Sequence, residues 1–295
     1  METSKQSSST TKDEAELKLS IENVRKQFLL EASKEPDLYY QCDIESVKSD
    51  QWWTERFIKW NQRNETNALK QMLNTFRWRK SFGIHDRTAI DIPREFVKAA
   101  GIFPYGNDHK NRPILYIRVK VYQNIQQLKE FFQQFVAGIV NHVDQLGGRN
   151  GFVVVYDASE AGWRNLDYEF IQFLLQLFQH YYPYGLRYII FYKFSKILQP
   201  FWKLSRLVLG SASRTFHFCN TAEELAAFIP KQYILRYMGG ESDFDFTDYV
   251  EVRNAPSVRE LAVRYGFTVE EVNKFIAIFE EQFRETDRIR NIKKK

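Results

Sequence analysis

Short β-rich runs alternate with helix-length segments through the middle of the chain, and this alternation limits the possible folds. The β-rich runs are residues 113–119, 151–157, 187–193 and 214–218. The intervening segments, near 126–146, 166–181, 195–209 and 222–229, carry apolar residues three and four positions apart, as amphipathic helices do. Strands separated by helices pair in parallel, because the helix returns the chain to the same edge of the sheet. We therefore predict an α/β fold with a mainly parallel sheet.

The sequence on either side of this block has a helical pattern. Residues 1–14 are mostly Ser, Thr and charged residues, which predicts a disordered tail, and residues 15–95 predict an N-terminal helical region. The α/β domain is expected over 96–241. Residues 242–295 predict a C-terminal helical extension, with capping boxes at Ser257/Glu260 and Thr268/Glu271.

Composition indicates a folded protein of a reducing compartment. The 295 residues are 44% hydrophobic, and the chain has 2 cysteines, Cys42 and Cys219, which require no disulfide framework. The first residues form no apolar signal segment, and no run approaches the roughly 18 apolar residues of a membrane span. We expect a cytoplasmic protein that associates peripherally with endomembranes.

Motifs for catalysis are missing from the sequence. It contains no GxGxxG, no GxxxxGK[ST], no HExxH and no GxSxG. Asp157, at the end of a predicted strand, is more simply explained as a turn-capping carboxylate than as an acid catalyst. Cys219 has no neighbouring cluster of donors that would stabilise a thiolate. The prediction is a protein that is not an enzyme and that has no metal and no cofactor, apart from a bound lipid as ligand.

Nucleic acid is not an expected partner. The net charge of +5 is modest. The segment ELAVRYGFTVEEVNKF could be taken for a helix-turn-helix, but its second helix carries acidic residues where a DNA reader needs cations. We expect these C-terminal helices to pack on the domain or to dock a protein partner.

The segment from Tyr192 to Gly210 is both basic and aromatic. On a helical wheel its cations fall in one arc, and these are Lys193, Lys196, Lys203 and Arg206. Apolar residues that include Leu198, Phe201 and Trp202 occupy much of the remainder. Such a helix suits an anionic membrane interface. An ordinary surface helix with a solvated basic face explains the pattern equally well, so both interpretations stay open.

The order of several motifs resembles the CRAL-TRIO lipid-binding family. These motifs are DQWWTERFIKW with LKQMLNTFRWRK, DHKNRPILYIRV, FVVVYDASEAG, QHYYPYGLRYIIFY, SRTFHFCNTAEELAAFI and the closing YMGG, and they cover roughly residues 50–240. The part from about residue 50 is similar to the N-terminal helical region of that family. The resemblance implies a lipid cavity floored by the sheet and closed by a mobile helical gate, which corresponds to residues 195–209.

The resemblance also suggests which residues meet the ligand. Pocket-lining candidates are Tyr116, Tyr156, Tyr192 and Phe218 on the strands, with Leu198, Phe201 and Trp202 on the gate. Tyr184 stands where phosphatidylinositol-transferring members have Glu after YYP, and Arg214 stands where they have Lys. Both residues are headgroup candidates. Together the two departures argue against phosphatidylinositol, although Arg214 could still bind a phosphate.

Two functions are compatible with the sequence. The first is a carrier that binds a phospholipid, sterol or similar lipid and presents it during transient contact with anionic membranes. The second is a membrane-recruitment or protein-interaction module that keeps the fold without transferring lipid. The two differ in whether the cavity is open to a ligand or filled by the protein's own side chains.

Overall fold

The computed structural model describes residues 2–86, 93–165, 167–195, 216–242, 244 and 255–293. The chain divides into two compact units. The helical unit comprises Met1–His85 together with Phe178–Gly185, and the α/β unit comprises Asp86–Leu177 and Leu186–Lys295. The first boundary lies close to the predicted one at residue 95, but the inclusion of Phe178–Gly185 in the helical unit was not predicted.

Four α-helices form the body of the helical unit. They are α1 (Glu2–Lys34), α2 (Gln41–Ser49), α3 (Trp52–Trp60) and α4 (Glu65–Phe82), and a 3₁₀ turn (Pro36–Leu38) follows α1. Helix α4 starts where the Asn64 side chain accepts a hydrogen bond from the Asn67 amide, and it ends at Gly83 with φ of 79°. Its buried face contributes Phe76, which packs against Phe28 with 5.0 Å between ring centroids.

Helix α1 starts earlier in the chain than the sequence indicated. We predicted a disordered tail over 1–14 and a helix from about Ala15, whereas α1 begins at Glu2. A helix that is already anchored extends easily, because each added residue contributes one backbone hydrogen bond without a new nucleation step. The anchor is the apolar face of α1, where Ile21, Val24 and Phe28 are buried.

The short segment Phe178–Gly185 is held by α3 and α4. Tyr181 stacks on Trp78 with 3.7 Å between ring centroids and 7° between ring planes. The Arg56 Nε donates to the carbonyl of Pro183 at 2.8 Å. The hydroxyl of Thr75 donates to the carbonyl of His180 at 3.0 Å. Side chains of the helical unit thus satisfy backbone groups of a segment that is distant in sequence.

The described residues of the α/β unit form a five-stranded sheet in the order β1-β2-β3-β4-β5. The strands are β1 (Ile102–Asn107), β2 (Pro113–Arg118), β3 (Phe152–Asp157), β4 (Leu186–Tyr192) and β5 (Phe216–Cys219). Strands β2 to β5 are parallel, as predicted, and β1 pairs antiparallel with β2 at the edge. The sequence prediction did not include β1.

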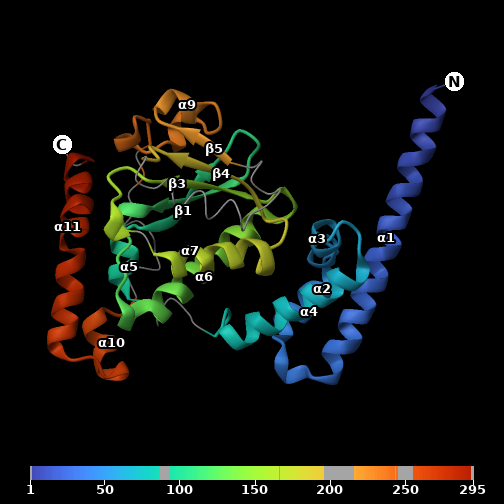
Figure 1. Cartoon of the computed structure of the whole chain (residues 1–295), viewed down its shortest axis with the longest axis horizontal. Helices are drawn as coiled ribbons and strands as arrows, with labels where there is room; N and C mark the ends of the chain where they lie inside the picture. Colours follow the sequence, from blue (N-terminus) through green and yellow to red (C-terminus); the bar gives the residue numbers. More distant parts are fainter. Residues whose placement is uncertain are drawn as a thin grey trace. The chain divides into compact units, whose positions relative to one another are not determined.

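Helical segments cover both faces of the sheet (Figure 1). On one side lie α6 (Lys129–Gly147) and α7 (Tyr168–Gln176), together with the short α5 (Arg94–Lys98). On the other side lie α9 (Ala222–Ala226) and the turns after it. The second face holds a closed apolar core in which Val153, Val155 and Ile190 meet Leu225 and Ile234.

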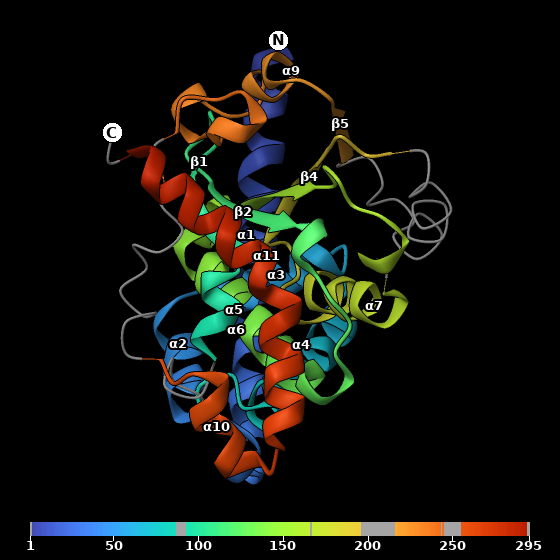
Figure 2. The ribbon, with the colours of Figure 1, turned by 90° about the vertical axis from the view of Figure 1, so that its left-hand side faces the viewer.

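Two helices complete the α/β unit at its C-terminal end. They are α10 (Val258–Tyr265) and α11 (Val269–Lys293), and α11 passes in front of α5 and α6 in Figure 2. Both predicted capping boxes are confirmed, with reciprocal hydrogen bonds between Ser257 and Glu260 and between Thr268 and Glu271. The Val258 amide donates to Glu95 in α5 at 2.9 Å. The predicted extension is therefore packed on the domain.

Candidate functional site

A row of apolar side chains crosses the face of the sheet that α6 and α7 cover. Ile117, Tyr156, Phe191 and Phe218 are register partners on β2, β3, β4 and β5. The ring of Phe191 lies 5.3 Å from Tyr156 and 5.3 Å from Phe218 between centroids. We call these four residues the cross-strand row. It ends at Phe218, which is 48% exposed although it is a large aromatic side chain on a strand.

Tyr116 and Tyr192 lie on the opposite face of the sheet. Tyr116 donates to the carbonyl of Tyr233 at 2.6 Å, and Tyr192 donates to the carbonyl of Met238 at 3.2 Å. Both are buried in the closed core beside α9. Successive residues of a strand point to opposite faces, so Tyr116 cannot share the face of Ile117. The structure therefore does not bring these two predicted pocket residues together with Tyr156 and Phe218.

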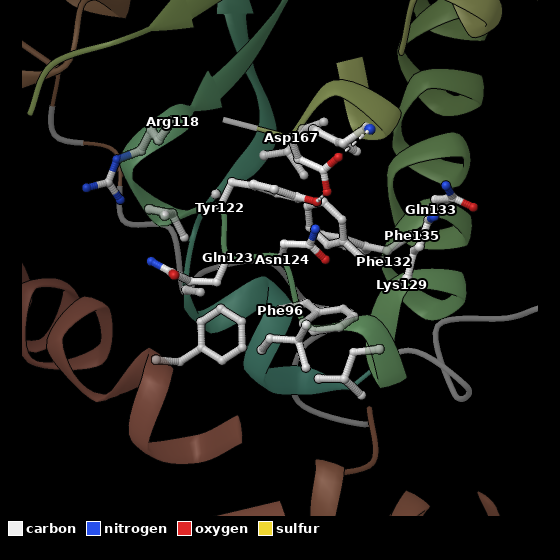
Figure 3. A pocket seen from close by; sticks show the side chains of 18 of the residues that line it. Phe96, Arg118, Tyr122, Gln123, Asn124, Lys129, Phe132, Gln133, Phe135 and Asp167 are labelled. Atoms are coloured by element: carbon white, nitrogen blue, oxygen red, sulfur yellow. Dashed lines mark hydrogen bonds between the residues drawn. The ribbon is translucent and has the colours of Figure 1, made fainter. Parts of the chain in front are cut away.

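A cavity adjoins the Ile117 end of the cross-strand row. It contains about 50 Å³ of space and is bounded by α5, α6, β2 and α11. Its apolar wall includes Phe96, Phe132, Phe135, Phe170 and Phe279. The labelled part of this lining is drawn in Figure 3. The cavity and the row share Ile117, so the cavity lies at the buried end of the row.

One side of the cavity is polar. In Figure 3 the hydroxyl of Tyr122 points toward the carboxylate of Asp167, to which it donates at 2.6 Å. Burial, together with the neighbouring Asp167, raises the pKa of Tyr122 far above its usual range, so the phenol remains a neutral donor. The second oxygen of Asp167 caps α7 by accepting from the Phe170 amide at 3.1 Å. The hydrogen bonds of Tyr122 and Asp167 therefore stabilise this wall of the cavity.

Several predicted site residues lie outside the described part of the chain. They are Lys196, Leu198, Phe201, Trp202, Lys203, Arg206 and Arg214. Lys193 is described and exposed, and its ammonium lies 5.4 Å from the centroid of the Tyr192 ring. Tyr184 belongs to the helical unit, where it meets Trp52 edge to face at 6.1 Å and Lys59 at 5.9 Å.

Sequence reasoning missed Ile117, Phe191 and Phe279. Alternation marks Ile117 and Phe191 as partners of Tyr156 once the register of the strands is known. Both faces of these strands are apolar, however, and a strand buried on both faces gives no signal for the face that meets a ligand. Phe279 belongs to a helix more than 100 positions away from the strands it adjoins.

Asp157 has a structural role in the core. Its Oδ1 accepts from the Ser159 amide at 2.9 Å, which is the predicted turn cap, and its Oδ2 accepts from the Tyr237 hydroxyl at 2.7 Å. The guanidinium of buried Arg118 lies 5.3 Å from the Tyr237 ring centroid. Burial, reinforced by Asp157, raises the pKa of Tyr237 well above its usual value. Asp157 and Arg118 thus both contact Tyr237 inside the core.

Cys219 has the environment of an inert thiol. It is buried at the end of β5. Burial, with a smaller contribution from Glu224, raises its pKa to about 11. A thiol with a raised pKa is a poor nucleophile at neutral pH.

Among the described residues, Cys42, Asp43 and His85 have donor atoms within 4.8 Å of one another, a spacing that a metal ion could use. Arg79, however, already donates to both oxygens of Asp43, at 2.7 and 2.9 Å. Burial alone would raise the pKa of Asp43, but hydrogen bonds from His85 and Arg79 hold it below the usual range. A guanidinium in direct contact with the carboxylate opposes a cation there, so these residues fit an ion pair better than a metal.

No helix in the described ranges combines the length and apolar character needed to cross a bilayer.

The arrangement defines an α/β domain with an apolar, partly exposed sheet face beside a small cavity. Residues 99–240 match the family described as the CRAL/TRIO domain. The chain therefore contains a CRAL/TRIO domain over these residues.

Two curated relatives agree with this assignment. The chain is 23% identical over 209 residues to phosphatidylinositol transfer protein CSR1 of Eremothecium gossypii, covering 66% of this chain and 48% of that protein. It is 23% identical over 208 residues to CRAL-TRIO domain-containing protein C3H8.02 of Schizosaccharomyces pombe, covering 65% of this chain and 46% of that protein. The chain thus spans about half the length of these curated relatives.

The fold is similar to that in the crystal structure of Sfh5. The TM-score is 0.59 at 15% identity, and the match covers 87% of this chain and 98% of that one. This similarity, together with the mainly parallel sheet of this chain, confirms the predicted α/β fold class.

Proposed function

We propose that this protein binds a lipid on the face of the sheet that carries the cross-strand row, and that it carries or presents this lipid at membrane surfaces. The observation that carries the proposal is the row itself, in which aromatic side chains lead from an apolar cavity to the half-exposed Phe218. Ile117 and Phe191 are buried, whereas the large aromatic side chain of Phe218 stays exposed at the end of the row, and an exposed apolar side chain that continues a buried apolar row is a suitable contact for an apolar ligand.

The size of the cavity supports a ligand that lies along the row. Its 50 Å³ has room for only a few water molecules, each of which needs roughly 10–15 Å³ of such space. A lipid therefore needs the surface of Tyr156, Phe191 and Phe218 as well. Burying hydrocarbon there stabilises the complex by about 0.8 kcal/mol per CH₂ group.

Membrane contact is proposed at the edge of the sheet where β3 and β4 end. Trp163, on the loop after β3, is 61% exposed, and the cation Lys193 directly follows β4. Asp157 and Tyr192, the last residues of these strands, are register partners, so both loops leave the same edge. An exposed tryptophan and a cation on loops that leave the same edge suit the polar-apolar boundary of an anionic membrane.

We propose a phospholipid, a sterol or a similar lipid as the ligand class. The name of the Eremothecium relative specifies phosphatidylinositol transfer by that protein. Tyr184 and Arg214 of this chain differ from the Glu and Lys of the phosphatidylinositol-transferring members that it resembles, which favours another headgroup. The alternative function is a membrane-recruitment or protein-interaction module without lipid exchange.

Native mass spectrometry of the purified chain, followed by lipid extraction, tests the proposal. A stoichiometric adduct that is released by organic solvent and identified as a lipid is the expected result. A protein that carries no lipid and takes up none from vesicles of phosphatidylcholine and phosphatidylserine would exclude the carrier function. That result would favour the interaction module.

A further inference from the structure

The cavity beside Ile117 has walls from two different parts of the chain. Most of its lining belongs to residues 99–240, the range that matches the CRAL/TRIO domain. Among the described residues that line it, Phe96 and Phe279 lie outside that range. Their ring centroids are 6.2 Å apart, with the planes at 66°. The C-terminal extension therefore contributes part of the surface that a ligand in this cavity would meet.

Helix α11 is held in place by contacts away from the cavity. Val272 and Phe275 are buried, and Phe275 packs edge to face on Phe267 at 5.7 Å. Phe267 in turn meets Phe131 of α6 at 6.3 Å. These contacts fix the position from which Phe279 reaches the cavity.

The cavity also lies at the buried end of the cross-strand row. The cross-strand row runs from exposed Phe218 to buried Ile117, over three strand spacings of about 4.8 Å each. Ile117 and Phe279 line the same cavity. A hydrocarbon chain that followed the row from its exposed end would arrive with its terminal segment against Phe279.

We propose that the cavity receives the terminal methyl segment of a lipid acyl chain and that Phe279 limits the length of the chain the protein accepts. This proposal rests on the proposed lipid-binding function and specifies one subsite of it. The subsite selects for acyl length because the cavity has room for only a short piece of hydrocarbon. Each further methylene that finds space should raise affinity about fourfold.

Two substitutions at position 279 should change the selection in opposite directions. Phe279→Ala removes the ring and lengthens the cavity, so the acyl chains that co-purify should become longer than those of the wild type. Phe279→Trp fills the cavity and should favour shorter chains. Phe283→Ala is the matched control for loss of a ring beside Phe279, because Phe283 packs against Phe279 with 6.2 Å between ring centroids but does not line the cavity.

The measurement is the acyl composition of the co-purified lipid, by mass spectrometry, relative to the same lipid class in the host membranes. Thermal unfolding of each variant shows whether it is folded. Opposite shifts for the two Phe279 variants, with none for Phe283→Ala, are expected. The wild type could carry lipid while the folded Phe279 variants carry lipid of the same acyl composition. In that case the length selection is wrong, but lipid binding stands. A ligand without an acyl chain also overturns the length selection, and a wild type without any lipid removes the proposed function and this subsite together.

Discussion

Arg79 donates to both carboxylate oxygens of Asp43, from Nε at 2.7 Å and from Nη2 at 2.9 Å, inside the helical unit. The side chains are 1% and 4% exposed. The guanidinium also lies 5.5 Å from the centroid of the Trp53 ring. This pair joins α2 to α4 in a place where neither charge can be transferred to water, so each group depends on the other.

Replacing Asp43 with Asn should strongly destabilise the helical unit. The amide cannot compensate the buried Arg79 charge, and removing one partner of a buried ion pair costs about 3–5 kcal/mol. Urea unfolding followed by circular dichroism gives the change in the free energy of unfolding. Asp37→Asn, at an exposed position, is the control and should change it by less than about 0.5 kcal/mol. Equal changes in the free energy of unfolding at the two positions would mean that the buried ion pair contributes no more to stability than an exposed carboxylate.

The same carboxylate should make stability depend on pH. Because the pKa of Asp43 is lowered in the folded state, its contribution is complete above the unfolded-state pKa of about 3.9. It is lost as the pH falls from there through the folded-state pKa. The free energy of unfolding of the wild type should therefore decline more steeply below about pH 4 than that of Asp43→Asn. Parallel curves for the two proteins would contradict the assignment.

Gly240 should tolerate no side chain. A Cβ atom there would lie 2.0 Å from the carbonyl oxygen of Ile234, which is backbone and cannot move aside. Gly240→Ala should destabilise the α/β unit by at least about 2 kcal/mol in thermal or urea unfolding.

Gly138→Ala provides the comparison, because a Cβ atom at this position in α6 meets nothing within 4 Å. This substitution should be neutral or stabilising by up to about 1 kcal/mol, since alanine has the higher helix propensity. If the Gly240 variant is as stable as the Gly138 variant, the close contact with the Ile234 carbonyl does not exclude a side chain at position 240.

Lipid occupancy should depend on the face of the sheet that is altered. Phe218→Ala removes an aromatic ring from the exposed end of the cross-strand row, and the loss of about 1.5 kcal/mol of burial should weaken lipid binding roughly tenfold. Tyr192→Phe alters the opposite face, where it deletes the hydrogen bond to Met238 and leaves the ring. It should lower stability by about 1 kcal/mol and leave lipid occupancy unchanged. The reverse pattern, measured by native mass spectrometry, would place the ligand on the other face.

Trp163 should contribute to vesicle binding. Trp163→Ala removes a side chain that is 61% exposed. Because the ring would be partly buried at the membrane interface, its loss should weaken vesicle binding roughly three- to tenfold. Co-sedimentation with phosphatidylserine-containing vesicles measures this. Trp60→Ala, a tryptophan 37% exposed in the helical unit, is the control. Unchanged binding after loss of Trp163 would exclude this loop from the membrane contact.

The parallel strands were predictable from the sequence because each is a compact apolar run. The edge strand β1 was not predictable. Its sequence, IFPYGN, contains Pro104 and Gly106, which normally indicate a turn. Pro104 is tolerated because β1 is an edge strand that pairs only with β2 among the described residues. Gly106 has φ of 65° and lies against the Tyr233 ring, so the strand is irregular for reasons that involve distant residues.

The candidate site was predictable only in part. Tyr156 and Phe218 were found as aromatic residues on predicted strands, and the structure places them in one row. Tyr116 was chosen on the same grounds and points the other way, because chemical character alone does not distinguish two apolar faces. The cavity wall at Phe279 depends on how α11 packs against α5, and no local pattern in the sequence contains that information.

The return of Phe178–Gly185 to the helical unit means that the two units are interleaved along the chain. A single cut at the first boundary would not separate them. A fragment that begins at residue 86 retains Tyr181 but loses Trp78, on which its ring stacks, and loses the Arg56 group that satisfies the Pro183 carbonyl. The strand β4 begins directly after this segment, at Leu186. Deletion or exchange of the N-terminal helices alone would therefore remove the contacts that hold the segment leading into β4, an interior strand, so the two units should be expressed and engineered together.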